Sequence, residues 1–140
     1  MKNFGLIVGM CFLAFSTIAA TPSVLDEAAM LGTMAGLAET CGENNKKLAD
    51  FELISARLIA NKSVSDQEEI RGYRRYAEEK ATAIRKQKDN PQMSCDEILH
   101  RFENMPIFKS VVYSDGSLKL ADGTFLKAKR PPAKLNKKNK

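Results

Sequence analysis

The feature that most constrains the fold of this chain is an apolar leader followed by a remainder that holds only two cysteines. An apolar segment runs from Leu6 to Ala20 behind the single positive charge of Lys2. This layout is typical of a signal peptide, and we expect cleavage after Ala19 or Ala20. An uncleaved membrane anchor is the alternative, and it is disfavoured because a spanning helix needs about 20 apolar residues.

Export would leave two cysteines, Cys41 and Cys95. Cys11 lies inside the leader and has more apolar residues beyond it, so we interpret it as an ordinary leader residue. In an oxidising compartment the remaining pair is expected to form a disulfide, and closing a loop of about 54 residues would contribute roughly 4 kcal/mol. A redox-active pair is the alternative, but the chain has no Cys-x-x-Cys and no histidine beside either cysteine.

Four helices are predicted from apolar spacing and from start and stop signals. Their expected ranges are Val24 to Cys41, roughly Lys46 to Ala60, roughly Asp66 to Lys88, and Cys95 to about Asn104. Three of them begin with a serine followed by an acid three residues later, a capping box, at Ser23 and Asp26, Ser65 and Glu68, and Ser94 and Glu97. Gly42 is the residue type that most easily ends the first helix.

The first predicted helix carries a broad apolar face, which we expect to be deeply buried. Met30 and Met34 lie on this face and are predicted to fill the core. Gly32-x-x-x-Gly36 is interpreted as permitting close packing against a neighbouring helix. Cys41 is expected to face the core at the end of this helix.

The third predicted helix is the clearest amphipathic one in the sequence. Its apolar stripe consists of Ile70, Tyr73, Ala77, Ala81 and Ile84. We expect this stripe to be the buried face, with Tyr73 in the core and Tyr76 at its border. In the fourth helix, Cys95 is expected to share the core-facing side with Ile98 and Phe102.

After Pro106 the pattern changes to three short apolar runs, residues 109–113, 117–120 and 124–127, separated by two Asp-Gly pairs. Asp-Gly between such runs favours a tight β-hairpin turn. The sequence therefore predicts a mainly α protein: a signal peptide (1–20), a small bundle of about four helices with a disulfide (21–106), a β-hairpin (107–127) and a disordered basic tail (128–140).

The net charge of +5 is concentrated at the C-terminal end. The seven basic residues there are Lys127, Lys129, Arg130, Lys134, Lys137, Lys138 and Lys140. Apart from these and Lys2, the chain carries 14 basic and 17 acidic residues. One hypothesis is that the tail binds an anionic partner: an envelope protein, a cell-wall polymer or an anionic lipid surface. The alternative is a solubilising disordered end with no dedicated partner. Nucleic acid is not expected after export.

No group of residues indicates catalysis, a metal site or a cofactor. His100 is the only histidine, and neighbouring acids such as Glu78 and Glu79 point in different directions on a helix. We therefore predict a non-enzymatic periplasmic protein that acts as an interaction or envelope-associated module. The alternatives are a secreted inhibitor or virulence-associated factor, and a small-ligand or lipid-binding helical carrier. That carrier would have an interior pocket lined by Met30, Met34, Phe51 and Leu58.

Several short motifs resemble an uncharacterised alphaproteobacterial family of small exported proteins. They are Leu31-Gly32, Leu37 and Cys41-Gly42, followed by Gly72-Tyr73-Arg74 and Tyr76. The chain differs from that pattern in having no tryptophan after Cys41-Gly42 and a longer interval before its second cysteine. The resemblance implies an envelope protein with two paired cysteines and no catalytic residues.

Overall fold

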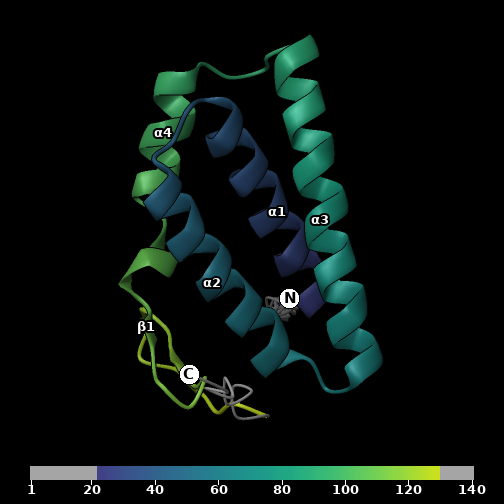
Figure 1. Ribbon diagram of the computed structural model, residues 1–140, viewed down its shortest axis with the longest axis vertical. Coiled ribbons are helices and arrows are strands. Elements are labelled where there is room, and N and C mark those ends of the chain that lie inside the picture. The colour runs from purple at the N-terminus through teal and green to yellow at the C-terminus, as the bar shows by residue number, and fades with distance from the viewer. Residues whose placement is uncertain (1–21, 130–140) are drawn as a thin grey trace, which may run out of the picture.

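Four helices and a small antiparallel sheet make up residues 22–129, the part of the chain that this computed structural model describes (Figure 1). In chain order the elements are α1 (Val24–Thr40), α2 (Asn45–Lys62), α3 (Asp66–Asp89), α4 (Cys95–Glu103), the 3₁₀ helix η1 (Pro106–Lys109), β1 (Val111–Val112), β2 (Leu118–Lys119) and β3 (Phe125–Leu126). The expected mainly helical fold is thus confirmed. The predicted signal peptide and residues 130–140 of the predicted disordered tail lie outside the described residues.

The helix starts follow from local capping. The hydroxyls of Ser23, Ser65 and Ser94 each accept from the backbone N–H three residues later, at 3.2 to 3.3 Å. Such a bond satisfies one of the backbone donors that the first turn leaves unpaired. Gly42 adopts a φ of 79° directly after α1 and its cap, as the sequence predicted.

α1 and α3 pack so closely that no side chain fits between their backbones at two positions. A Cβ atom added to Gly32 would lie 2.2 Å from the carbonyl oxygen of Tyr76, and one added to Gly36 would lie 2.4 Å from that of Lys80. The glycine pair therefore permits the close helix contact that the sequence predicted. α1 lies between α2 and α3 in the bundle (Figure 1).

This close approach changes which face of α3 is buried. Gly72, Ala83 and Gln87 are buried, whereas Ile70 is 58% and Tyr73 is 39% exposed. The predicted buried stripe therefore lies beside the buried face, along the groove between α3 and α2, and the prediction that Tyr73 lies in the core is wrong. The physical reason is that Gly32 and Gly36 of α1 lie directly against the backbone of α3 at Tyr76 and Lys80, with Ala83 beside Gly36, so the side of α3 that carries these residues faces α1.

The core is centred on three aromatic rings from different elements. Phe51, Phe102 and Phe108 have ring centroids 4.9 to 5.7 Å apart. Leu118 of β2 is fully buried in the same cluster. The sheet therefore packs against the helices through Leu118. This packing stabilises it, because so small a sheet is only marginally stable by itself.

The disulfide between Cys41 and Cys95 is present, with Cα atoms 5.2 Å apart. It joins the cap that ends α1 to the first residue of α4. Cys95 is exposed and Cys41 is half-buried, so the expectation that both face the core is wrong. α4 buries Ile98 and Phe102, which lie further along the helix, and its first turn projects past the core.

The predicted hairpin is the start of a three-stranded antiparallel sheet in the order β1-β2-β3. Both connections are four-residue turns closed by the N–H of Gly116 or Gly123, which donates to the carbonyl three residues earlier at 2.9 and 3.0 Å. Asp-Gly therefore occupies the last two turn positions and not the centre. Asp115 and Asp122 each accept from the backbone N–H two residues later at 2.8 Å, and these bonds lower the pKa of both carboxyls.

Candidate functional site

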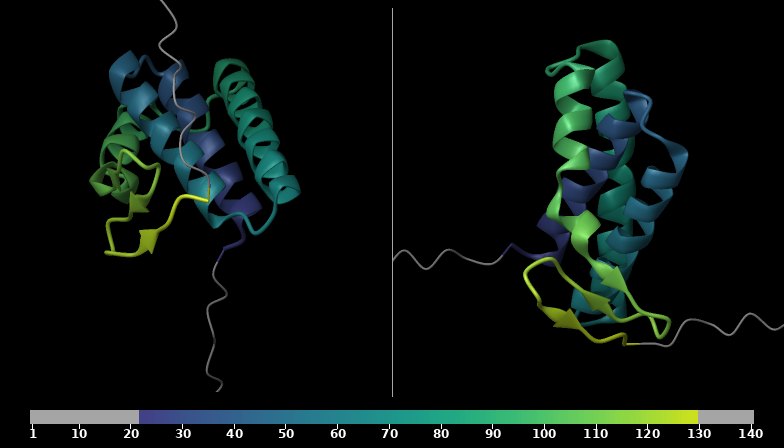
Figure 2. Two further views of the ribbon diagram at one scale, coloured as in Figure 1. Left: turned by 60° about the horizontal axis from the view of Figure 1, so that its bottom comes forward. Right: turned by 90° about the vertical axis from the view of Figure 1, so that its left-hand side faces the viewer.

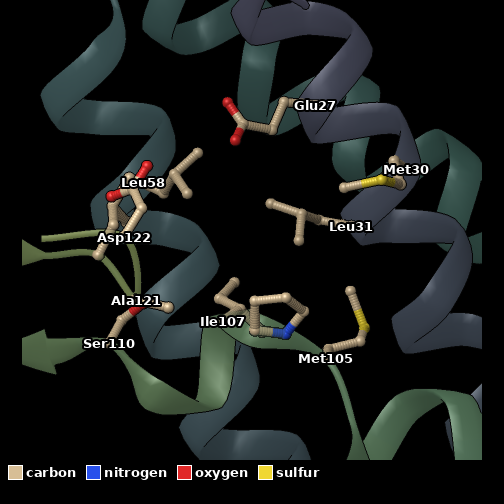
Figure 3. A pocket seen from close by; sticks show the side chains of 11 residues that line it. Glu27, Met30, Leu31, Leu58, Met105, Ile107, Ser110, Ala121 and Asp122 are labelled. Carbon is tan, nitrogen blue, oxygen red and sulfur yellow. The ribbon is translucent and has the colours of Figure 1, made fainter. Parts of the chain in front are cut away.

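A cavity of about 290 Å³ lies between α1, α2 and the C-terminal segment (Figure 3). It is at the end of the bundle where α1 begins, α2 ends and the sheet packs (Figures 1 and 2). The residues lining it are Glu27, Met30 and Leu31 of α1, Leu58 of α2, Met105, Pro106, Ile107 and Ser110 around η1, and Leu120, Ala121 and Asp122 before β3. Its volume is near the lower end of the range typical of small-molecule sites, roughly 300 to 1,000 Å³.

Two methionines from different elements flank the cavity. Met30 is 53% exposed, so the prediction that it fills the core is wrong, and Met105, which is partly buried, lies below it in the view of Figure 3. Methionine side chains adapt readily to irregular ligands because they are unbranched and polarizable. The predicted pocket included Met30 and Leu58, which do line the cavity, but also Met34 and Phe51, which belong to the core cluster instead.

Few polar groups reach the cavity. Both carboxylate oxygens of Glu27 accept from Nζ of Lys62, at 2.8 and 3.0 Å, so this pair largely neutralises itself. The Oγ atom of Ser110 is buried and has no hydrogen-bond partner among residues 22–129. A buried hydroxyl without a partner is costly, and a ligand able to hydrogen-bond to it would remove that cost.

A second surface lies on the outer side of the sheet. The register places Val111 opposite Lys119 and Lys119 opposite Phe125, so these three side chains form one row across the strands. Val111 is 50% and Phe125 is 56% exposed, and the ring of Tyr113 packs edge-on against Phe125 at 5.7 Å. We call Val111, Tyr113, Lys119, Phe125 and Lys127 the outer sheet face.

The predicted anion-binding residues begin at this surface. Lys127 and Lys129 are exposed directly after β3, and Lys127 follows Phe125 by two residues, which places both on the same side of an extended strand. Arg130, Lys134, Lys137, Lys138 and Lys140 lie outside the described residues. The alternation of the three apolar runs was the signal in the sequence that could have identified the outer sheet face, but only the pairing shows which residues share a row.

Other candidate sites are weak in the described part of the chain. Within residues 22–129 no group of three or more His, Cys, Asp or Glu side chains is placed to hold a metal ion. His100 is exposed on α4 beside Asn104. No helix described here is both long enough and apolar enough to cross a membrane. The disulfide is compatible with an exported protein.

Comparison of the chain with protein families, with curated proteins and with solved structures finds no match. The resemblance to an exported alphaproteobacterial family therefore stays a prediction.

Proposed function

We propose that this chain is an exported, non-enzymatic protein that associates with an anionic lipid surface of the cell envelope. The observation that carries the proposal is the row of Val111, Lys119 and Phe125 across the sheet, which combines exposed apolar side chains with a positive charge. Lys127 extends the same side toward the basic C-terminal residues.

The composition of the outer sheet face favours a lipid surface over a purely polar polymer. Aromatic side chains partition into the interface between lipid head groups and acyl chains, and each nearby lysine adds about 1 kcal/mol of attraction to anionic lipid. Full burial of a phenylalanine side chain contributes about 1.5 to 3 kcal/mol, so partial insertion of Phe125 would add to the attraction of the lysines.

The test is co-sedimentation with vesicles of phosphatidylethanolamine containing phosphatidylglycerol, compared with vesicles of phosphatidylcholine alone. We expect binding to the anionic vesicles that weakens with salt, and weaker binding for Phe125→Ala and for a chain ending at Leu126. Val64→Ala is the matched control, because Val64 is 88% exposed but lies on the connection between α2 and α3.

Equal binding to both kinds of vesicle, or equal loss for Phe125→Ala and Val64→Ala, would contradict the proposal. Salt-dependent binding to cell-wall polymer or to an envelope protein, with none to vesicles, would retain the basic residues as the contact but replace the lipid as the partner.

We also propose a second candidate function, the binding of a small apolar molecule in the cavity beside Met30. The observation that favours it is the apolar lining together with the buried hydroxyl of Ser110, which has no hydrogen-bond partner in the described part of the chain. Such a ligand would present one hydrogen-bonding group to this hydroxyl and bury the rest of its surface among aliphatic side chains. The secreted-inhibitor hypothesis stays a prediction.

The two Asp-Gly turns provide a matched pair of variants for this second candidate. Ala121 and Ser114 hold the same position in the two turns, but only Ala121 lines the cavity. With the neutral dye 1-N-phenylnaphthylamine as the probe, Ala121→Trp should abolish the fluorescence enhancement and Ser114→Trp should leave it intact. No enhancement with the unaltered protein, or equal loss in both variants, would contradict the cavity as a binding site.

A further inference from the structure

The side of α3 that borders the groove toward α2 carries a stripe that is symmetric about its central residue. The stripe runs Asp66, Ile70, Tyr73, Ala77, Ala81, Ile84, Lys88, with spacings of four, three, four, four, three and four residues. Seven and eleven residues are close to two and three full helical turns, so all members lie on one face of the helix. Ile70 and Tyr73 are substantially exposed, Ala77 and Ala81 are exposed as well, and Ile84 is half-buried.

The two ends of this stripe are complementary in size and in charge. An antiparallel copy of α3 that crosses at Ala77 would bring Ile70 against Ile84, so that two aliphatic side chains meet. It would also bring Tyr73 over the small Ala81, and Asp66 against Lys88. A two-fold axis makes each of these contacts twice, as a self-complementary dimer interface requires.

We propose that two copies of this chain associate through the α3 stripe in an antiparallel arrangement centred on Ala77. The occupant of the exposed face is therefore a second copy of the same chain. The stripe is the most regular apolar pattern in the sequence, and within the single chain it stays largely exposed.

α2 widens the surface beside the stripe. A shallow groove between the two helices is lined by Ala56, Tyr73, Ala77 and Ala81, and Leu53 of α2 is 49% exposed. Lys80 borders this groove, but its Nζ atom binds Glu39 at 2.7 Å and Glu52 at 2.5 Å. Its charge is therefore balanced within its own chain and does not oppose the approach of the same residue of a second copy.

The two-fold axis gives a direct test, because it places Ala77 beside the same residue of the second copy. Ala77→Cys, exported so that Cys41 and Cys95 can pair, should form a disulfide-linked dimer on a non-reducing gel. Lys86→Cys is the matched control, since Lys86 is exposed on α3 but lies on the side opposite the stripe. Equal crosslinking of both variants would overturn the proposal.

Sedimentation of the unaltered protein should show a concentration-dependent mass of two chains. Asp66→Lys should weaken the dimer by about tenfold, because it sets two like-charge pairs against each other, and adding Lys88→Asp should restore it. Circular dichroism of each variant separates loss of the dimer from loss of the fold. A protein that stays monomeric over the whole concentration range, or a double variant no better than Asp66→Lys, would overturn the proposal.

Discussion

The contact between α1 and α3 makes Gly32→Ala the most informative single change to the fold. The added Cβ would lie 2.2 Å from the carbonyl oxygen of Tyr76 and 2.9 Å from the carbonyl carbon. Ordinary contacts between carbon and a carbonyl oxygen are about 3.3 Å or longer, so the backbone of α3 would have to move by about 1 Å. Overpacking of this kind costs roughly 1 to 3 kcal/mol, against a gain of about 1 kcal/mol in helix propensity.

Because the added Cβ would lie only 2.2 Å from a backbone oxygen, the cost falls in the upper half of that range, and we expect Gly32→Ala to lower the free energy of unfolding by about 1 to 2 kcal/mol in urea denaturation. Gly72→Ala is the matched control, because its Cβ would meet a methyl group of Ile59 at 2.6 Å, a longer contact than the 2.2 Å at Gly32 and one that a side chain relieves without moving a helix backbone. A smaller loss is expected there. If Gly32→Ala proves as stable as the unaltered protein, the reasoning from the close approach is refuted.

Three further predictions follow from contacts in the bundle. Replacing Cys41 and Cys95 by serine should lower the free energy of unfolding by roughly 4 kcal/mol in urea, and an unchanged midpoint would contradict the chain-entropy argument. Phe51→Ala should cost about 3 to 5 kcal/mol, because the ring is fully buried between two others; a loss below about 1 kcal/mol would show that this cluster is not the core. Burial raises the pKa of Tyr76 to about 12, so the stability due to its protonated form should be complete below about pH 10 and be lost as the pH rises through 12. A spectroscopic titration should show a late phenolate phase that Tyr76→Phe removes, and its persistence in that variant would assign it to another tyrosine.

The sequence predicted local features well, because their causes lie within a few residues. The serine caps need only a hydroxyl and a free backbone N–H in the first turn, and Gly42 needs only its own conformational freedom. The disulfide was predictable from the predicted signal peptide and the number of cysteines, although the exposure of Cys95 was not, since this depends on how far α4 extends past the core.

Burial of α3 could not be predicted from its periodicity. The stripe through Tyr73 and Ala77 has the spacing of a buried face, but Gly32 and Gly36 bring the adjacent side of α3, with Tyr76, Lys80 and Ala83, against α1. The cavity was missed in part for a related reason: Ser110 reaches it only because η1 and the sheet fold back over α1 and α2. Such placements depend on contacts between elements far apart in the chain.

Insertion of Phe125 into anionic lipid is the most direct test of the proposed function, and the chain suits it because it contains no tryptophan. In Phe125→Trp the only indole would report on the outer sheet face. We predict a blue shift of its emission, and quenching by a lipid-borne quencher, on adding vesicles that contain phosphatidylglycerol. Val64→Trp should show neither. Emission from Phe125→Trp that stays at its value in water while the protein sediments with the vesicles would contradict the account.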